Sequence, residues 1–445
     1  MPRMTFPDAQ SYWISRRIPT DQFLLYCFDA AEPLDRLAAS LLVRARQIPD
    51  LCLQIREVPF RLDVPWWTPM EPDPSLVVVH DGPRSWEQCR GDVAGLLTDS
   101  LDPTESPWRL HLFGPVSEAP EGRGDAVVAV LQVAHALGDG RRTAEIARLL
   151  FTDTPLPPSP TVGRWRPALA TAVALGEIPV NLARLVLRMR PAYLAHRQRN
   201  LDTESGVIPE KPSSRSTLVT NGTPDWRREI RTVVVPSADL RGPGVTVTVG
   251  VLTAVSVALS RYAAEAVAEH GAAAEVTVAR SGRSAARNHF CNVTVDLHPE
   301  IADLRQRALT IAASLRAQRL RADHPSRAVE ERATAAVPAP LLRRGIDQFD
   351  FTAVPDEVTG NTVVSSVDRG PADLALGGGA VRFTAGFPAL SAFMGLTHGV
   401  HGIGDRVTIS VATSPAVVPD TDRYEEFLRD AVRQVSAANS SSGSP

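Results

Sequence analysis

A chain of 445 residues is too long for one compact core, and we expect two domains of ordinary size. Hydrophobic residues make up 44% and charged residues 22%, which is typical of globular proteins and excludes general disorder. The formal net charge of -3 offers no cationic field for a phosphate backbone, so we expect no nucleic-acid partner.

The first half alternates strands and helices. Apolar runs and helical spacing predict strands at 22–28, 51–55, 75–79, 108–113 and 126–134, and helices at 34–47, 85–100 and 141–151. Gly138 and Gly140 bracket a tight loop directly after the last of these strands. Residues 1–160 are therefore predicted to form an N-terminal α/β subdomain.

Residues 161–225 are predicted to be a crossover segment and linker. A Pro-rich stretch at 154–160 precedes the segment 164–194, which carries several arginines and no acid except Glu177. This composition is typical of a basic amphipathic helix on a membrane or lipid-droplet surface, and a helix packed on its own protein is the alternative. Residues 200–225, rich in Ser, Pro, Thr, Glu and Gly, are predicted to be the linker itself.

The second half predicts another mixed α/β subdomain, at 226–438. Its predicted elements are strands at 229–235, 276–279, 292–297 and 362–366, helices at 249–259, 301–320 and 422–437, and a hairpin of 389–399 against 406–413 turned at 402–405. The Ser/Gly-rich tail 439–445 is predicted to be disordered.

No export signal or transmembrane segment is expected. The N-terminal sequence "MPRMTFPDAQSYWISRRIPTDQ" has no apolar core of signal-peptide length, and no later stretch runs long enough without charge to span a bilayer. We expect a cytoplasmic protein, with membrane association through 164–194 as the added hypothesis.

The stretch "QVAHALGDG" places His135 where a buried strand gives way to a glycine-bracketed loop. Strand ends are where α/β proteins tend to hold functional groups, and imidazole can accept a proton near neutral pH. We expect Asp139 to anchor the loop through an arginine, for which Arg280, Arg283 and Arg287 are the candidates. A structural histidine remains the alternative, because the pattern is short.

Several segments, in the same order along the chain, resemble the wax ester synthase/diacylglycerol acyltransferase (WS/DGAT) family. "HALGDG" resembles that family's HHxxxDG signature, and residues 101–108, 244–249, 288–299, 365–371 and 418–420 resemble its "PLD…RPLW", "GATVND", "GN…VDLP", "SNVPGP" and C-terminal segments. The resemblance spans nearly the whole chain. It implies two chloramphenicol-acetyltransferase-like subdomains with mixed sheets and an active-site tunnel between them.

The family pattern also implies roles for individual residues. His135 matches the general base that activates an acceptor hydroxyl for attack on an acyl thioester, and Asp139 and Gly140 match the rest of the catalytic motif. Four further positions fall in motifs that would contact substrate: Ala134, Thr248, Asn288 and Ser366. At three of these the chain departs from the pattern, because Ala134 replaces the first histidine, Thr248-Val249 the Asn-Asp pair, and Ser366 the asparagine.

The resemblance implies an acyl-CoA-dependent O-acyltransferase. Acyl-CoA would be a co-substrate, the acceptor a diacylglycerol or long-chain alcohol, and no cofactor is implied. Two alternatives stay open: a condensation or tailoring enzyme that takes its acyl group from an acyl carrier protein, and a catalytically degenerate protein that binds lipid or a partner.

Other motifs are weaker. The four cysteines, Cys27, Cys52, Cys89 and Cys291, show no ligand spacing and are expected to be free thiols. His398 and His401 flank the predicted hairpin turn, where we expect solvated side chains and no metal. Residues 281–284 lack a GxSxG frame, and the triplet 377–379 is expected to be a flexible turn.

Overall fold

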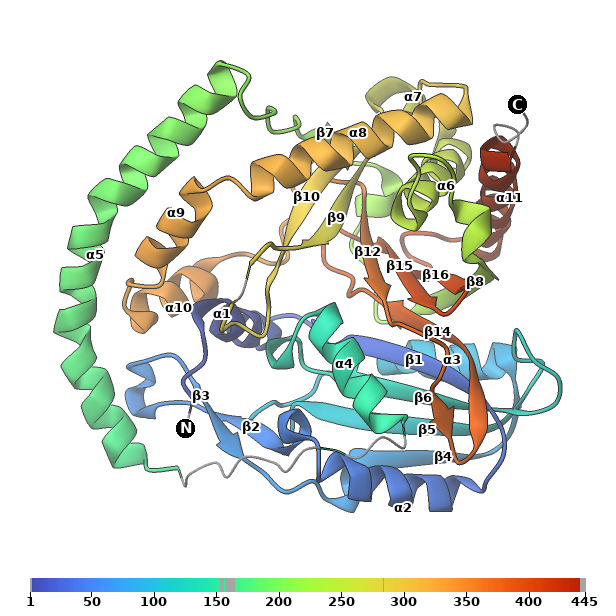
Figure 1. Cartoon of the computed structure of the whole chain (residues 1–445), viewed down its shortest axis with the longest axis horizontal. Helices are drawn as coiled ribbons and strands as arrows, with labels where there is room; N and C mark the ends of the chain where they lie inside the picture. The colour runs from blue at the N-terminus through green and yellow to red at the C-terminus, as the bar shows by residue number, and fades with distance from the viewer. Residues whose placement is uncertain (1, 153–155, 157–164, 283, 441–445) are drawn as a thin grey trace.

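The computed structural model describes residues 2–152, 156, 165–282 and 284–440. Within these residues, two six-stranded sheets lie one beyond the other, with helices on their outer faces (Figure 1). Each sheet combines parallel and antiparallel pairs: β4 pairs with β5 in parallel, and β12 pairs with both β9 and β15 in parallel. The predicted α/β class with mixed sheets is confirmed.

The first sheet has the strand order β13-β14-β1-β6-β5-β4. Its strands are β1 (Gln22–Asp29), β4 (Val77–Ser85), β5 (Trp108–Ser117), β6 (Ala126–Val133), β13 (Ala375–Leu376) and β14 (Gly379–Phe387). All eight residues of β6 are buried, because its alternate side chains enter two different cores, one covered by α2 (Leu34–Ala45) and the other by α3 (Trp86–Leu96). Burial on both faces explains the unbroken apolar run in the sequence.

The second half of the chain contributes two strands to the first sheet. β14 pairs antiparallel with β1, from Phe23 opposite Phe387 to Phe28 opposite Val381. Gly377 and Gly378, with φ of 57° and 82°, form the turn between β13 and β14, so the glycine triplet is a hairpin turn. Sequence reasoning missed β14. The predicted division into 1–160 and 226–438 therefore does not follow the sheets.

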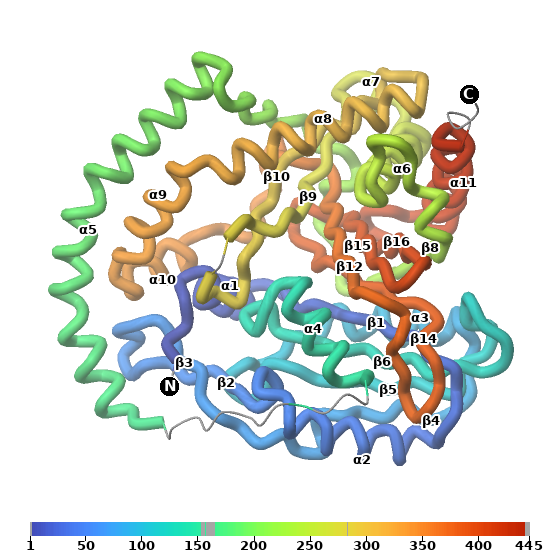
Figure 2. Tube along the Cα trace, in the orientation of Figure 1, coloured from blue at the N-terminus to red at the C-terminus, as the bar shows by residue number. Residues whose placement is uncertain are grey.

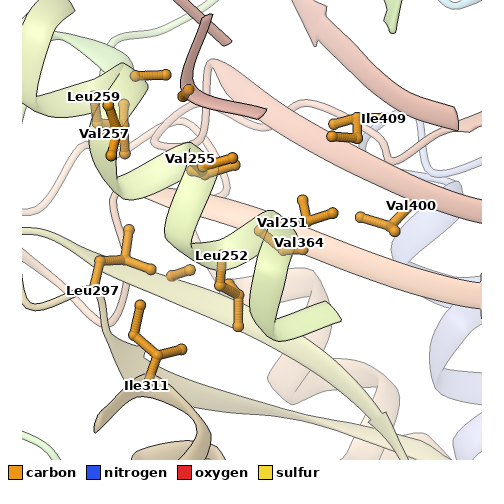
Figure 3. Packing of buried hydrophobic residues seen from close by; sticks show 14 of the residues in the cluster. Val251, Leu252, Val255, Val257, Leu259, Leu297, Ile311, Val364, Val400 and Ile409 are labelled. Carbon is orange, nitrogen blue, oxygen red and sulfur yellow. The ribbon is translucent and has the colours of Figure 1, made fainter. Parts of the chain in front are cut away.

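The second sheet has the order β10-β9-β12-β15-β16-β8. Its strands are β8 (Glu229–Pro236), β9 (Ala273–Ala279), β10 (Phe290–Asp296), β12 (Thr362–Asp368), β15 (Leu396–Ile403) and β16 (Arg406–Thr413). It packs against α6 (Val247–Tyr262), α8 (Leu304–Ala322) and α11 (Thr421–Ser440). Figure 3 shows Val251, Leu252 and Val255 of α6 facing strand side chains such as Val364.

The predicted hairpin is present but shifted along the chain. Ile403 pairs with Arg406, so the turn holds only residues 404–405, and β15 begins at Leu396 instead of 389. His398 and His401 consequently lie inside a buried strand, with exposed fractions of 0% and 6%. The expectation of solvated turn histidines was wrong, because the chain turns two residues later than the glycines indicated.

The long helix α5 (Pro167–Glu204) arches away from the body of the molecule, with α9 (Ser326–Thr334) inside the arch, as the Cα tube in Figure 2 shows. The helix continues to Glu204, so the predicted start of the linker at 200 was wrong. α5 is also long and apolar enough to cross a membrane by length and composition, with a mean hydropathy of 1.4 over its best window. This finding contradicts the expectation that no segment has those properties.

The remaining elements are short. They are α1 (Phe6–Ser15), β2 (Leu53–Arg56), β3 (Trp66–Pro69), α4 (Gly140–Leu150), β7 (Arg215–Ser216), α7 (Ala264–His270), α10 (Ala339–Gln348) and β11 (Glu357–Val358), with single 3₁₀ turns between them. α11 runs through Ser440, so the first two residues of the predicted disordered tail are helical. Residues 441–445 and all of the Pro-rich stretch 154–160 except Leu156 lie outside the described residues.

Candidate active site

His135 lines a cavity between the two sheets. It follows β6 and opens a single 3₁₀ turn, and Gln22 of β1 steadies this turn by donating to the Gly138 carbonyl at 2.6 Å. The cavity has a volume of about 450 Å³, and its walls come from β1, α4, β9, β10, β12, β14 and β15. Phe290 of β10 packs beside the imidazole, with ring centroids 5.5 Å apart.

A chain of hydrogen bonds orients the imidazole. Asn288 donates its amide N–H groups to Asp8 Oδ1 at 3.1 Å and to the His135 carbonyl at 2.9 Å. The amide oxygen then faces His135 Nδ1 at 3.0 Å, so Nδ1 carries the proton and donates it. The other ring nitrogen, Nε2, accepts no hydrogen bond from any described residue and is left with its lone pair. This tautomer is the one that a general base requires.

The surroundings keep this imidazole neutral. Burial lowers the pKa of His135 below the ordinary value of 6.5, and the bond to Asn288 and the charges of Asp139 and Asp8 offset burial only in part. A neutral imidazole at pH 7 can accept a proton, whereas an imidazolium cannot.

Asp139 supports the loop through backbone groups. Its carboxylate caps α4 by accepting from Arg142 N, and it also accepts from His289 N across the cleft, both at 3.0 Å. The Arg287 carbonyl accepts from Asp139 N at 3.1 Å.

The prediction that Asp139 anchors the loop through an arginine side chain was wrong. The Arg287 guanidinium pairs with Asp50 at 2.6 Å and lies over the Trp67 ring, and Arg280 pairs with Glu331. Arg283 lies outside the described residues. Since the Asp139 oxygens are taken by amide groups, the loop is anchored by a helix cap instead of an ion pair.

Gly140 permits a close contact between α4 and β12. A Cβ at this position would lie 2.7 Å from Cγ2 of Val367, which is too close for two carbon atoms. The first turn of α4 therefore sits directly against the end of β12, and the glycine allows His135 and the β12 residues to share one cavity.

Thr248 and Ser366 lie together at a second cavity. Thr248 Oγ1 donates to Ser366 Oγ at 3.0 Å, joining the start of α6 to β12. This second cavity, of about 500 Å³, shares Ser366, Val367 and Asp368 with the cavity of His135, so the two meet at the end of β12.

Two residues predicted to bind substrate do not line either cavity. Ala134 is fully buried and donates its N–H to the Pro107 carbonyl, so its methyl group belongs to the core. Asn288 is 6% exposed, and its amide is used by His135 and Asp8. It is a positioning residue for the imidazole.

Sequence reasoning missed Asp8 and the helix α1 that carries it. Asp8 is 1% exposed and accepts from Arg287 N, Asn288 N and Thr5 Oγ1. The only signal was a carboxylate in the sequence "FPDAQSYW", whose helical apolar spacing buries Ala9, Tyr12 and Trp13. Its partner lies 280 positions away, which local patterns do not reveal.

No group of three His, Cys, Asp or Glu side chains among the described residues is arranged to hold a metal ion. The four cysteines are free in the structure, as expected.

A family model matches the C-terminal part of the chain. Residues 287–436 match the family model described as the WS/DGAT C-terminal domain. The resemblance found in the sequence motifs is confirmed. None of the curated proteins is similar enough to this chain to count as a match.

Solved structures extend the likeness over the whole chain. The wax ester synthase/diacylglycerol acyltransferase from Marinobacter aquaeolei VT8 is 16% identical with a TM-score of 0.63, covering 99% of this chain and 100% of that one. The starter condensation domain of rhizomide synthetase RzmA, in complex with C8-CoA and Leu-SNAC, is 14% identical with a TM-score of 0.57, covering 98% and 94%.

A third likeness is to the TRI3 trichothecene 15-O-acetyltransferase from Fusarium sporotrichioides, at 12% identity and a TM-score of 0.54, covering 97% of this chain and 95% of that one. At such identities these likenesses establish the chloramphenicol-acetyltransferase-like fold. Together with the WS/DGAT domain they support an acyltransferase.

The contact between Gly140 and Val367 can be tested by stability. We expect Gly140→Ala to destabilise the protein by roughly 1–3 kcal/mol, because the added methyl overpacks against Val367. Adding Val367→Ala should restore most of that loss, giving a coupling between the two sites in chemical denaturation.

The matched control is Gly176→Ala in α5, where a Cβ has no atom within 4 Å. This change should leave stability equal or slightly higher, since alanine favours a helix. If the losses of stability in Gly140→Ala and Val367→Ala simply add in the double variant, the close contact between the two residues is contradicted.

Proposed function

We propose that the protein is an acyl-CoA-dependent O-acyltransferase in which His135 is the general base and the acceptor is a lipid hydroxyl, either diacylglycerol or a long-chain alcohol. The observation that carries this proposal is the tautomer: Asn288 occupies Nδ1, and Nε2 is free in the cavity. The WS/DGAT domain and the complex of the similar condensation domain with C8-CoA support the choice of donor.

The reaction balances without a covalent acyl-enzyme. Nε2 of His135 takes the proton of the acceptor hydroxyl while its oxygen attacks the thioester carbonyl. The tetrahedral intermediate collapses, the bond between carbonyl carbon and sulfur breaks, and the imidazolium returns the proton to the CoA thiolate. The two cavities that meet at β12 would hold the two substrates, one on each side, and thus supply proximity.

The central test is CoA release from palmitoyl-CoA, followed with a thiol reagent, with and without diacylglycerol or hexadecanol. We expect acceptor-dependent release, and we expect His135→Ala to lower kcat roughly 10²- to 10⁴-fold, which is the usual range for general-base catalysis. His270→Ala, at a partly exposed position at the end of α7, is the control and should retain full activity.

Equal activity of His135→Ala and wild type would contradict the role of His135 as base. Absence of release from palmitoyl-CoA with every acceptor would contradict acyl-CoA as donor, and a phosphopantetheinylated carrier protein loaded with an acyl group would then be tested. Absence of acyl transfer with both donors would favour a non-catalytic lipid-binding protein.

We further infer that α5 attaches this cytoplasmic enzyme to an anionic membrane or lipid-droplet surface. Ala170 and Ala174 pack on Val58 at one end of the helix, and Arg199 pairs with Glu330 near the other at 2.8 Å. A helix tied to its own protein at both ends lies along a surface and does not cross it.

Along nearly its whole length, α5 has the composition of an interfacial helix. Its exposed large apolar side chains are Leu169, Leu175, Val180, Leu182, Val186, Leu187, Met189, Tyr193, Leu194 and Leu201. Arginines alternate with these side chains, and Arg184 and Arg190 are exposed. Apolar area together with cationic groups favours anionic lipid.

Sedimentation with liposomes tests this inference. We expect the wild type to sediment with phosphatidylglycerol vesicles, less with phosphatidylcholine vesicles, and the variant Val186→Glu/Leu187→Glu to stay in solution. Val43→Glu, at an exposed valine of α2, is the matched control and should sediment like wild type. A wild-type protein that stays in the supernatant with anionic vesicles would contradict the inference.

A further inference from the structure

Arg369 is a buried cation on the wall of the His135 cavity that has no counterion. It follows β12, is 3% exposed, and lines the cavity. Its Nη1 donates to the Leu25 carbonyl at 3.4 Å and to the Thr384 hydroxyl, and its guanidinium lies 4.9 Å from the centre of the Tyr26 ring. No carboxylate among the described residues pairs with it, and its Nε has no hydrogen-bond partner.

Two other buried arginines show how unusual this is. Arg382 is 7% exposed and pairs with Asp29 at 2.7 Å. Arg307 is 6% exposed without a carboxylate, but it donates to the carbonyls of Ile301 and Pro299 and to a serine hydroxyl. All three nitrogens of Arg307 donate, whereas within the described part of the chain Nε of Arg369 has no partner and only its Nη1 donates to a carbonyl and a hydroxyl. A buried guanidinium with no counterion and an unused nitrogen is costly, which indicates that a bound group completes the site.

His401 of β15 stands beside Arg369. It is 6% exposed, lines the same cavity, and its Nδ1 has no partner. A Cβ built on Gly386 of β14 would lie 2.8 Å from both Arg369 Nη2 and His401 Nε2, so these two nitrogens are neighbours above a backbone without a side chain. The missing side chain at Gly386 makes room for both groups, so the site combines a cation and a second nitrogen donor on one wall of the cavity.

The charge of His401 does not add to the site. Burial, followed by the nearby Arg369, holds the pKa of His401 well below 6.5, so the imidazole is neutral and donates a single N–H. The charged groups facing this position are Arg369 and, within the cavity lining, Arg141, Asp21, Asp139 and Asp368.

We propose that Arg369 and His401 bind a carboxylate at the far end of an apolar substrate whose other end reacts at His135. A planar guanidinium pairs with a carboxylate through two parallel hydrogen bonds, and the neutral imidazole adds a third donor. The proposal rests on the proposed function for the reaction itself and names the substrate class: a long-chain hydroxy acid as acceptor, or an acyl donor with a terminal carboxyl group.

The sheet register gives the length of the apolar spacer. Gly386 lies opposite Leu24, and Leu24 lies opposite Leu131, four residues before His135. Two strand spacings across the sheet, roughly 10 Å, and four residues along the chain, at most roughly 13 Å, give a separation of roughly 16 Å, about the length of a medium-chain aliphatic acid. The apolar side chains of Leu24, Phe290 and Phe387 are among those lining the cavity.

Binding of ω-hydroxydodecanoic acid, compared with its neutral methyl ester by calorimetry, tests the proposal without requiring turnover. We expect the wild type to bind the acid more tightly by roughly tenfold or more, since hydrogen bonds to charged groups are strong. Arg369→Gln should bind acid and ester equally. Arg382→Gln, which removes a buried arginine outside the cavity, should keep the preference for the acid.

Equal binding of acid and ester by wild type would overturn the proposal, and this comparison needs no variant that might fail to fold. Retention of the preference in Arg369→Gln would overturn it as well. A protein that binds the acid preferentially and transfers no acyl group would contradict the proposed function alone.

Turnover distinguishes the two sources of the carboxylate. A preference for the acid over its ester as acceptor, with plain dodecanoyl-CoA, assigns the site to the acceptor. A preference for ω-carboxydodecanoyl-CoA over dodecanoyl-CoA, with a neutral alcohol, assigns it to the donor. Transfer that proceeds with no preference in either comparison would overturn the proposal.

Discussion

The hydrogen bonds from Asp8 through Asn288 to His135 are the constraint on which the site depends. A carboxylate can only accept, so Asp8 turns the amide N–H groups of Asn288 toward itself and leaves the amide oxygen for His135 Nδ1. That choice fixes the tautomer and leaves Nε2 as the free base. The segments that carry Asp8, His135 and Asn288 are distant in sequence and must lie side by side. Their contact requires the two halves of the molecule to keep a fixed relative position.

Two further features hold the halves together. β14, from the second half, pairs with β1 from Phe23 to Phe28. In addition, Asp50 pairs with both Arg287 and Arg142, which joins the loop before β10 to α4. Burial raises the pKa of Asp50, but the two arginines outweigh burial and hold it below its usual value, so the carboxylate stays charged.

The local parts of the site could be predicted from the sequence. The run "AVVAVLQVAHALGDG" encodes a strand buried on both faces, the loop and the start of α4, because each depends on neighbouring residues. The two α/β halves also followed from the order of strands and helices, and the family resemblance implied their mixed sheets. Thr248 and Ser366 were found through motif resemblance, and the structure brings them into contact.

The missing parts depend on distant partners. Nothing near Asp8 indicates that its oxygens meet residues 287 and 288, and the strand pattern of β14 does not say which sheet it joins. The glycines led us to predict the hairpin turn two residues too early. His401 was therefore predicted to be solvated, whereas the structure places it in the cavity wall. No sequence pattern singled out Arg369, because the lack of a nearby counterion can be seen only in the folded structure.

The ¹⁵N NMR titration of His135, assigned by comparison with His135→Asn, tests the central claim most directly. We expect a neutral ring at pH 7 with its proton on Nδ1, titrating below pH 6.5, and an altered tautomer balance in Asn288→Ala. A charged imidazole at pH 7, or a neutral ring with its proton on Nε2, would contradict the assignment of His135 as the base.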